Sequence, residues 1–230
     1  MLLFYQPAIA TSHFLDTDDS RHCVKVLRKT PKDIIHVVDG TGGLYECEIT
    51  KANEKKCEVK IVSWQTDFQK RNTYLHIAIA PTKNADRLEW FIEKAVEIGI
   101  DEISLILTKH SERRQQKTER LEKIAVSAMK QSLKAYLPRI NELVPFEKFL
   151  KSVLQEQKFL AHLTEESKPL VSKLKPGTAH CIMVGPEGDF AAEEIQLARD
   201  NGFEWVTLGN ARLRTETAGL VACTLSNNMF

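Results

Sequence analysis

Two short apolar runs, each stopped by a glycine-containing turn, constrain this chain more than any other feature. Residues 182–184 lead into Gly185-Pro-Glu-Gly188, and residues 205–208 lead into a polar segment that begins at Gly209. An apolar run that ends at glycine is typical of a buried strand followed by a loop. In open α/β sheets, ligands bind beyond the carboxyl ends of the strands. The two runs therefore predict a ligand site at one edge of a parallel sheet.

The first turn does not match the common phosphate-binding loops. Gly185-Pro-Glu-Gly188 has neither the Gly-x-Gly-x-x-Gly spacing nor the Gly-Lys-Ser/Thr of a P-loop. The acidic Glu187 would repel a phosphate, so we expect a ligand that is neutral or cationic near this turn. On this turn alone, a tight connection with a surface glutamate remains an equal alternative.

The second turn favours a functional site. Connections between strands and helices usually run only a few residues, and they need no dense polar cluster. Here six positions between the expected strand and an apolar helix hold five polar residues: Arg212, Arg214, Thr215, Glu216 and Thr217.

The region from residue 74 onward alternates strands and helices. This order predicts an α/β fold with a largely parallel sheet covered on both faces. The strands are expected at residues 74–80, 103–107, 159–163, 182–184 and 205–208, and the helices at 85–99, 119–136, 191–201 and 218–227.

The first 70 residues predict a separate, β-rich module. Residues 34–39 and 44–49 flank Gly40-Thr-Gly-Gly43, which is typical of a hairpin with a glycine-rich turn. Residues 57–62 alternate like a half-buried strand, and residues 18–29 are expected to be helical. We expect a polar linker at residues 62–73, and two domains at 1–70 and 71–230.

Basic residues gather in two places. Arg21, Lys25 and Arg28 would share one face of the expected first helix, although an ordinary solvated face remains an alternative. Between residues 109 and 139, nine Lys and Arg stand against three Glu, in a chain whose net charge is only +1. Such asymmetry is typical of a polyanion partner, and we expect the contact at Arg113, Arg114 and Lys117. A salt-bridged, exposed helix is the alternative.

The five cysteines are odd in number, widely spaced and without a C-x-x-C pair. They predict neither a disulfide framework nor a zinc site, and they suit a reducing cytoplasm. We expect no signal peptide, because Pro7 interrupts the apolar start, and no membrane span, because no apolar run approaches about 20 residues.

The glycine turns carry a family resemblance. Val184-Gly-Pro-Glu-Gly-Asp-Phe190 followed by Leu208-Gly-Asn-Ala-Arg-Leu-Arg-Thr-Glu-Thr-Ala218 resembles the paired signature of the SPOUT-class, RsmE-type ribosomal RNA methyltransferases. His22-Cys-Val-Lys-Val-Leu-Arg28 resembles the start of the same family. The chain departs from the pattern at Asp189, where the family usually has Gly, and at Cys23, where it usually has His.

The resemblance implies a knotted SPOUT-type parallel sheet domain with a C-terminal trefoil knot, preceded by a small PUA-like β-barrel that binds RNA. It also implies a homodimer. The implied reaction transfers a methyl group from S-adenosylmethionine to uracil N3 of a specific uridine in 16S rRNA of the small ribosomal subunit. We expect no metal, because the sulfonium already activates the methyl group.

The resemblance, together with the converging strand ends, gives the expected site residues. Those expected to bind the cofactor are Leu163, Gly185, Pro186, Glu187, Gly188, Leu208, Gly209, Leu213, Arg214, Thr215, Thr217 and Ala218. Those expected to bind RNA are Arg21, His22, Lys25, Arg28, Arg113, Arg114 and Lys117.

The chemistry suggests catalytic roles. Uracil N3 must lose a proton, and the resulting charge spreads over the flanking carbonyl oxygens. Arg214, or Arg212 in second place, is expected to stabilise that charge. Glu216 or Glu187 could accept the proton, although either could instead orient an arginine or cap a helix. Likewise, Thr215 or Thr217 could be an N-cap of the last helix rather than a cofactor contact.

Two alternative functions remain open. A non-catalytic RNA-binding or ribosome-assembly factor on the same fold is disfavoured by the intact polar cluster from Arg212 to Thr217. An unrelated nucleotide-binding α/β enzyme is disfavoured by the missing phosphate loops.

Overall fold

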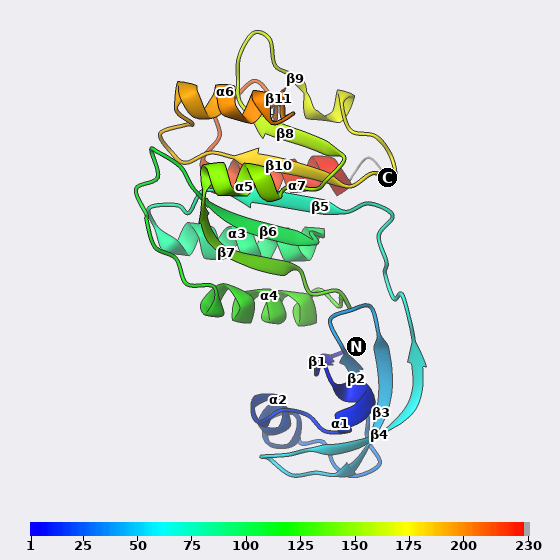
Figure 1. Ribbon diagram of the computed structural model, residues 1–230. Coiled ribbons are helices and arrows are strands. Elements are labelled where there is room, and N and C mark those ends of the chain that lie inside the picture. Colours follow the sequence, from blue (N-terminus) through cyan, green and yellow to red (C-terminus); the bar gives the residue numbers. More distant parts are fainter. Residues whose placement is uncertain (228–230) are drawn as a thin grey trace. The chain divides into compact units, whose positions relative to one another are not determined.

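The computed structural model describes residues 1–227 of the chain. It divides into two compact units (Figure 1), residues 1–70 with 126–137, and residues 71–125 with 138 onward. The end of the expected second domain, residues 228–230, lies outside the described residues.

The first unit is built on a four-stranded sheet with the order β1-β2-β3-β4. The strands are β1 (Leu3–Tyr5), β2 (Ile34–Val38), β3 (Leu44–Lys51) and β4 (Glu58–Gln65). β1 runs parallel to β2, and the other pairs are antiparallel. The expected hairpin of β2 and β3 is confirmed. Because β4 continues to Gln65, the linker begins later than residue 62, where it was expected.

The helical segment of this unit is shorter than expected. After α1 (Ile9–Ser12), Asp16 accepts a hydrogen bond from Asp19 N (2.7 Å) and caps α2 (Thr17–Arg21). A π-helical turn (His22–Val26) follows, and Arg28 then adopts a left-handed φ of 55°. The expectation that Arg28 shares a helix face with Arg21 and Lys25 is therefore wrong.

The segment 126–137 belongs to the first unit through backbone and side-chain bonds. Gly42 N donates to Ala135 O (3.0 Å), and Leu137 N donates to Gly40 O (2.9 Å). Lys130 Nζ lies 2.7 Å from Oδ1 of the buried Asp19. This lysine thus stabilises the fold. It is not one of the unpaired basic residues of the region.

Helix α4 (Glu119–Gln131) ends earlier than residue 136, where it was expected to stop. The reason is Leu133, which adopts a left-handed φ of 59° and turns the chain. Lys134 N donates to Met129 O (3.0 Å), as in the bonds that commonly close a helix.

The second unit holds a seven-stranded sheet in which every pair is parallel, with the order β7-β6-β5-β10-β8-β11-β9. This confirms the expected α/β architecture. The strands are β5 (Leu75–Ile79), β6 (Glu102–Leu107), β7 (Arg139–Pro145), β8 (Gln157–Ala161), β9 (Lys168–Pro169), β10 (His180–Val184) and β11 (Glu204–Thr207). The sequence patterns did not predict β7 and β9.

Helices cover both faces of this sheet (Figure 1). On one face, α3 (Ala85–Ile98) packs against α7 (Thr215–Asn227), which also contacts β5 and β10. The other face carries α5 (Phe146–Ser152), which was not predicted, and α6 (Ala192–Asp200). A short 3-10 helix (Leu170–Ser172) follows β9.

The strand order reverses near the middle of the sheet. From β5 the chain moves outward through β6 to β7, whereas β8, β11 and β9 lie on the other side of β10. In sheets of this kind a ligand crevice opens at the point of reversal, beyond the carboxyl ends of the strands. The order makes β10, β8 and β11 neighbours, so their carboxyl ends lie together.

Candidate functional site

A cavity of about 340 Å³ lies beyond the carboxyl ends of β8, β10 and β11. Its walls come from residues 161–163 after β8, from the turn after β10 and from the loop after β11, with Thr215 and Ala218 of α7. This volume lies within the range of small-molecule sites. The two glycine-containing turns and the edge at Leu163 therefore meet around one cavity.

The turn after β10 is built around Asp189. This residue has a left-handed φ of 62°, a conformation that aspartate adopts more readily than most residues. Its Oδ1 accepts a hydrogen bond from Phe190 N (2.7 Å), and its carbonyl accepts one from Nδ1 of His110 (3.0 Å). The backbone at this position therefore accommodates a side chain where the resembled family usually has Gly.

Glu187 forms part of the same wall, and its two carboxylate oxygens differ. Oε1 accepts a hydrogen bond from Lys83 N (3.1 Å). Oε2 is buried and has no hydrogen-bond partner among the described residues. The ammonium of Lys83 turns elsewhere and pairs with Glu112 Oε2 at 2.8 Å. Glu187 is therefore not an orienting partner for an arginine among these residues.

The loop after β11 exposes backbone to the cavity at Gly209. Thr207 Oγ1 accepts a hydrogen bond from Gly209 N (3.2 Å) and donates to Gly209 O (2.5 Å). Gly209 has a φ of 134°, and a Cβ built there would meet no atom within 4 Å. The open space in front of this glycine lets a ligand approach the main chain.

Thr215 joins the two turns. Its side chain is buried, and its Oγ1 donates to the carbonyl of Gly185 at 3.0 Å. Helix α7 already begins at Thr215, and Ala218 N donates to Arg214 O (2.7 Å). The alternative in which Thr215 or Thr217 caps the helix from outside is therefore wrong.

Most of the expected cofactor residues line the cavity. They are Leu163, Gly185, Pro186, Glu187, Leu208, Gly209, Leu213, Thr215 and Ala218. Gly188, Arg214 and Thr217 are not part of its lining.

The expected catalytic residues lie in three different surroundings. Arg212 lines the cavity, whereas Arg214 is exposed at the start of α7. Glu216 is only 6% exposed, and its Oε1 lies 3.7 Å from Nε of Arg87 on α3. Its Oε2 has no partner among the described residues. The cavity thus holds one of the two arginines.

His162 lines the cavity but was not predicted. Its Nδ1 lies 3.5 Å from Asp189 Oδ2, and its ring packs edge-on against Trp205 with centroids 6.0 Å apart. The available sequence signal was a polar residue inside the expected strand 159–163. The structure ends β8 at Ala161, which places His162 in the ligand-facing loop.

The basic residues that are expected to contact RNA differ from neighbouring basic residues in whether they form ion pairs. Arg120 pairs with Glu89 at 2.6 Å, and Lys109 pairs with Glu193. By contrast, Arg113, Arg114 and Lys117 form no ion pair with residues 1–227. The local excess of positive charge therefore lies in the loop between β6 and α4.

In the first unit, the residues expected to bind RNA differ in their exposure. Arg21 and Lys25 are exposed, whereas His22 packs edge-on against Phe4, with ring centroids 6.1 Å apart. All five cysteines are buried, and no disulfide joins any of them.

The described residues provide neither a metal site nor a membrane-spanning helix. In residues 1–227, no group of three or more His, Cys, Asp or Glu could hold a metal ion. None of the helices in this part of the chain is long and apolar enough to cross a bilayer.

Comparison with known proteins identifies the family and agrees with the fold. Residues 69–227 match a family model described as the RNA methyltransferase domain. The chain belongs to this RNA methyltransferase family. Residues 15–62 match a second model, the RNA methyltransferase PUA domain, which confirms the expected PUA-like module. Membership excludes the alternative of an unrelated nucleotide-binding enzyme.

Individual relatives agree with this assignment. Ribosomal RNA small subunit methyltransferase E of Bacillus subtilis strain 168 is 27% identical, over 89% of this chain and 85% of that protein. A probable rRNA-methyltransferase from Porphyromonas gingivalis is 40% identical with a TM-score of 0.93, and the match covers 100% and 98% of the two chains. Ribosomal RNA small subunit methyltransferase E from Neisseria gonorrhoeae, bound to S-adenosyl methionine, is 27% identical with a TM-score of 0.85 and the same coverage.

In this RNA methyltransferase-family chain, Thr215→Val should lower the free energy of unfolding by about 1–3 kcal/mol, because it leaves the Gly185 carbonyl without its donor. Urea unfolding followed by circular dichroism measures the change. Thr217→Val is the matched control on the same helix, and it should change stability by less than about 0.5 kcal/mol. Equal losses in the two variants would show that the bond between the turns contributes nothing particular.

Proposed function

We propose that this protein binds S-adenosylmethionine in the cavity and methylates uracil N3 of a specific uridine in 16S rRNA of the small ribosomal subunit. The observation that carries the proposal is the meeting of both signature turns around one cavity at the ends of β8, β10 and β11. The cofactor-bound relative from Neisseria gonorrhoeae, with a TM-score of 0.85 over the whole chain, supports it.

The proposal includes an organisation of the chain. Residues 1–70 form the RNA-binding PUA-like module, and residues 71–230 form the methyltransferase domain with the C-terminal trefoil knot. The protein acts as a homodimer in the cytoplasm, where the small ribosomal subunit is found. Arg21, His22, Lys25, Arg28, Arg113, Arg114 and Lys117 contact the RNA.

The residues around the cavity have distinct roles in this proposal. When bound, S-adenosylmethionine supplies a methyl group that its sulfonium charge already activates. The glycine-rich turns hold the cofactor largely through backbone groups, so that the target nitrogen can be placed in line with the methyl–sulfur bond. Arg214 and Arg212 stabilise the negative charge that develops on the uracil carbonyl oxygens.

Glu216 is the proposed acceptor of the N3 proton. Its side chain is buried, two residues after Arg214 in the sequence, and its Oε2 has no partner among the described residues. A carboxylate oxygen that is not already engaged can take a proton from a base held next to it. The neighbouring Arg87, 3.7 Å from Oε1, keeps the carboxyl group oriented.

The reaction itself is tested with labelled S-adenosylmethionine and two substrates, deproteinised 16S rRNA and assembled small subunits. Nuclease digestion followed by mass spectrometry of the nucleosides should detect N3-methyluridine. Methylation at another atom would contradict the N3 assignment. RNA binding without methyl transfer to either substrate would favour the alternative of a non-catalytic assembly factor.

Arg214→Ala should lower kcat by about 10²–10³-fold while S-adenosylmethionine affinity stays nearly normal, because Arg214 lies outside the cavity lining. Arg212→Ala, within the lining, should weaken cofactor binding as well. Single-turnover methylation and calorimetry separate the two effects. An Arg214→Ala enzyme that turns over normally, or that fails only through lost cofactor binding, would transfer the proposed role to Arg212.

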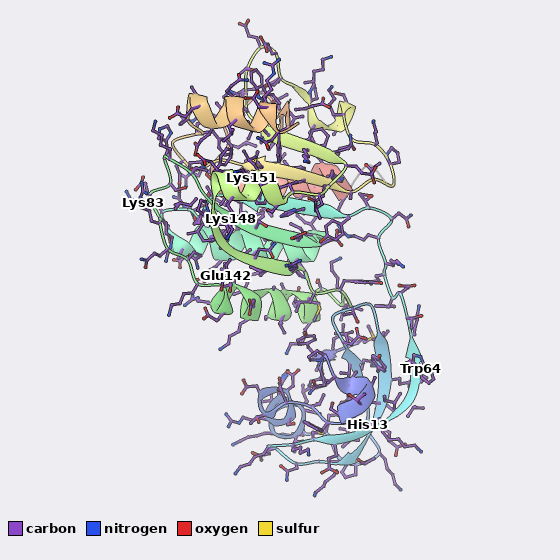
Figure 2. All side chains as sticks on the ribbon, viewed as in Figure 1. His13, Trp64, Lys83, Glu142, Lys148 and Lys151 are labelled. Atoms are coloured by element: carbon purple, nitrogen blue, oxygen red, sulfur yellow. The ribbon has the colours of Figure 1, made fainter. Side chains whose placement is uncertain are left out.

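Charge reversal at Arg113 and Arg114 should weaken RNA binding and reduce the dependence of log K on log salt by about 0.7 for each lost phosphate contact. Filter binding across a salt series measures this slope. Reversal of Lys148 and Lys151 on α5 (Figure 2) is the control, since both are exposed and the change in net charge is identical. An unchanged slope in the Arg113/Arg114 variant would make that loop an ordinary solvated surface.

A further inference from the structure

The carboxylate of Glu187 is incompletely satisfied at the wall of the cavity. Lys83 N holds Oε1 at 3.1 Å, which fixes the side chain to the loop between β5 and α3. Oε2 is buried and has no partner among the described residues. A buried polar atom without a partner is costly, and a carboxylate oxygen is costlier than most. Such an atom in a ligand cavity therefore points to a partner supplied by the ligand.

The charged groups nearby do not satisfy this oxygen. The Lys83 ammonium, on the exposed side chain labelled in Figure 2, pairs with Glu112 Oε2 at 2.8 Å. Asp189, the other acid of the cavity, is already engaged by Phe190 N and by His162, and its side chain is 59% exposed. Water can therefore solvate the Asp189 carboxylate, whereas Glu187 Oε2 is buried.

The partner that best suits a buried carboxylate oxygen is a cation. Hydrogen bonds and contacts between opposite charges are roughly twice as strong as neutral ones, and they strengthen where water is excluded. A neutral hydroxyl or amide donor would satisfy the oxygen geometrically but would leave its charge balanced only by the exposed Lys83 ammonium, whose pKa is raised by Glu112 and, to a smaller extent, by Glu187. Uncompensated buried charge is the larger cost.

We propose that Glu187 is the counter-ion for a positive charge on the methyl donor and makes the cavity selective for cationic ligands over neutral adenosine thioethers. This inference rests on the proposed function, because it takes S-adenosylmethionine as the ligand. That molecule has two positive groups, its sulfonium and its α-ammonium. S-adenosylhomocysteine keeps only the ammonium, and methylthioadenosine has neither, so the three ligands separate the sources of charge.

The test compares wild-type protein with Glu187→Gln by calorimetry against the three ligands. Glutamine keeps the shape and leaves an amide oxygen to accept from Lys83 N, so only the charge is removed. S-adenosylmethionine affinity should fall by about 10–100-fold, the range of a hydrogen bond to a charged group. Methylthioadenosine affinity should change by less than about 2-fold, which is well below that range.

The third ligand assigns the charge. If S-adenosylhomocysteine weakens as much as S-adenosylmethionine, Glu187 faces the ammonium, and if it is unaffected, Glu187 faces the sulfonium. Either result supports a counter-ion. Glu193→Gln is the matched control outside the cavity, because it removes the same charge from an exposed side chain. It should weaken S-adenosylmethionine binding by less than about 3-fold, as expected for a screened charge.

Two results would overturn this inference without affecting the proposed function. One is an equal loss for all three ligands, which would mean that Glu187 only shapes the turn. The other is unchanged affinity for S-adenosylmethionine. Glu187→Asp retains the charge and should keep a preference for S-adenosylmethionine over methylthioadenosine, even if the glutamine variant is unstable. A wild-type protein that binds none of the three ligands would instead overturn the proposed function, and this inference with it.

Discussion

The adjacency of three parallel strands, β10, β8 and β11, is the constraint on which the rest of the structure depends. Because parallel strands end at the same edge, the segments that follow these three must lie side by side. Those segments are far apart in the chain, yet each contributes a wall of one cavity.

Helix α7 then fixes the spacing between the walls. Gly219 lets the helix approach α3 and β5 so closely that a Cβ would lie 2.6 Å from the ring of Phe91. One turn earlier, Thr215 donates to the carbonyl of Gly185. Close packing and one buried hydrogen bond therefore hold the start of α7 against the first turn. The position of the helix start in turn fixes where Leu213 and Arg212, just before it in the chain, enter the cavity wall.

The sequence predicted the features that depend on local chemistry. The apolar runs of β5, β10 and β11 and the glycine turns follow from residue type and spacing. Most of the cavity lining was expected from the family resemblance together with the converging strand ends. The edge strand β7 escaped prediction because polar residues interrupt it. His162 was not predicted because its pairing with Asp189 depends on the order of the strands in the sheet. That order brings His162 Nδ1 to 3.5 Å from Asp189 Oδ2. Arg28 and Leu133 adopt left-handed backbone conformations that end helices. Neither helix end could be predicted, because no glycine marks it in the sequence.

The charges around the site are separated in a way that suits two different ligands. Inside the cavity, Glu187 presents a buried negative oxygen, whereas Arg113 and Arg114 lie in the exposed loop after β6. The loop is nevertheless tied to the cavity wall. His110 bonds the Asp189 carbonyl, and Glu112 pairs with Lys83, whose N–H holds Glu187.

These ties have a consequence for the proposed reaction. A phosphate backbone held by the basic loop would be held by the same bonded network that positions the turn after β10. The negative interior suits a cationic donor, and the positive exterior suits a polyanion, so neither ligand competes for the surface of the other. Loop and turn come from different parts of the chain, and they meet only because β6 and β10 end at the same edge of the sheet.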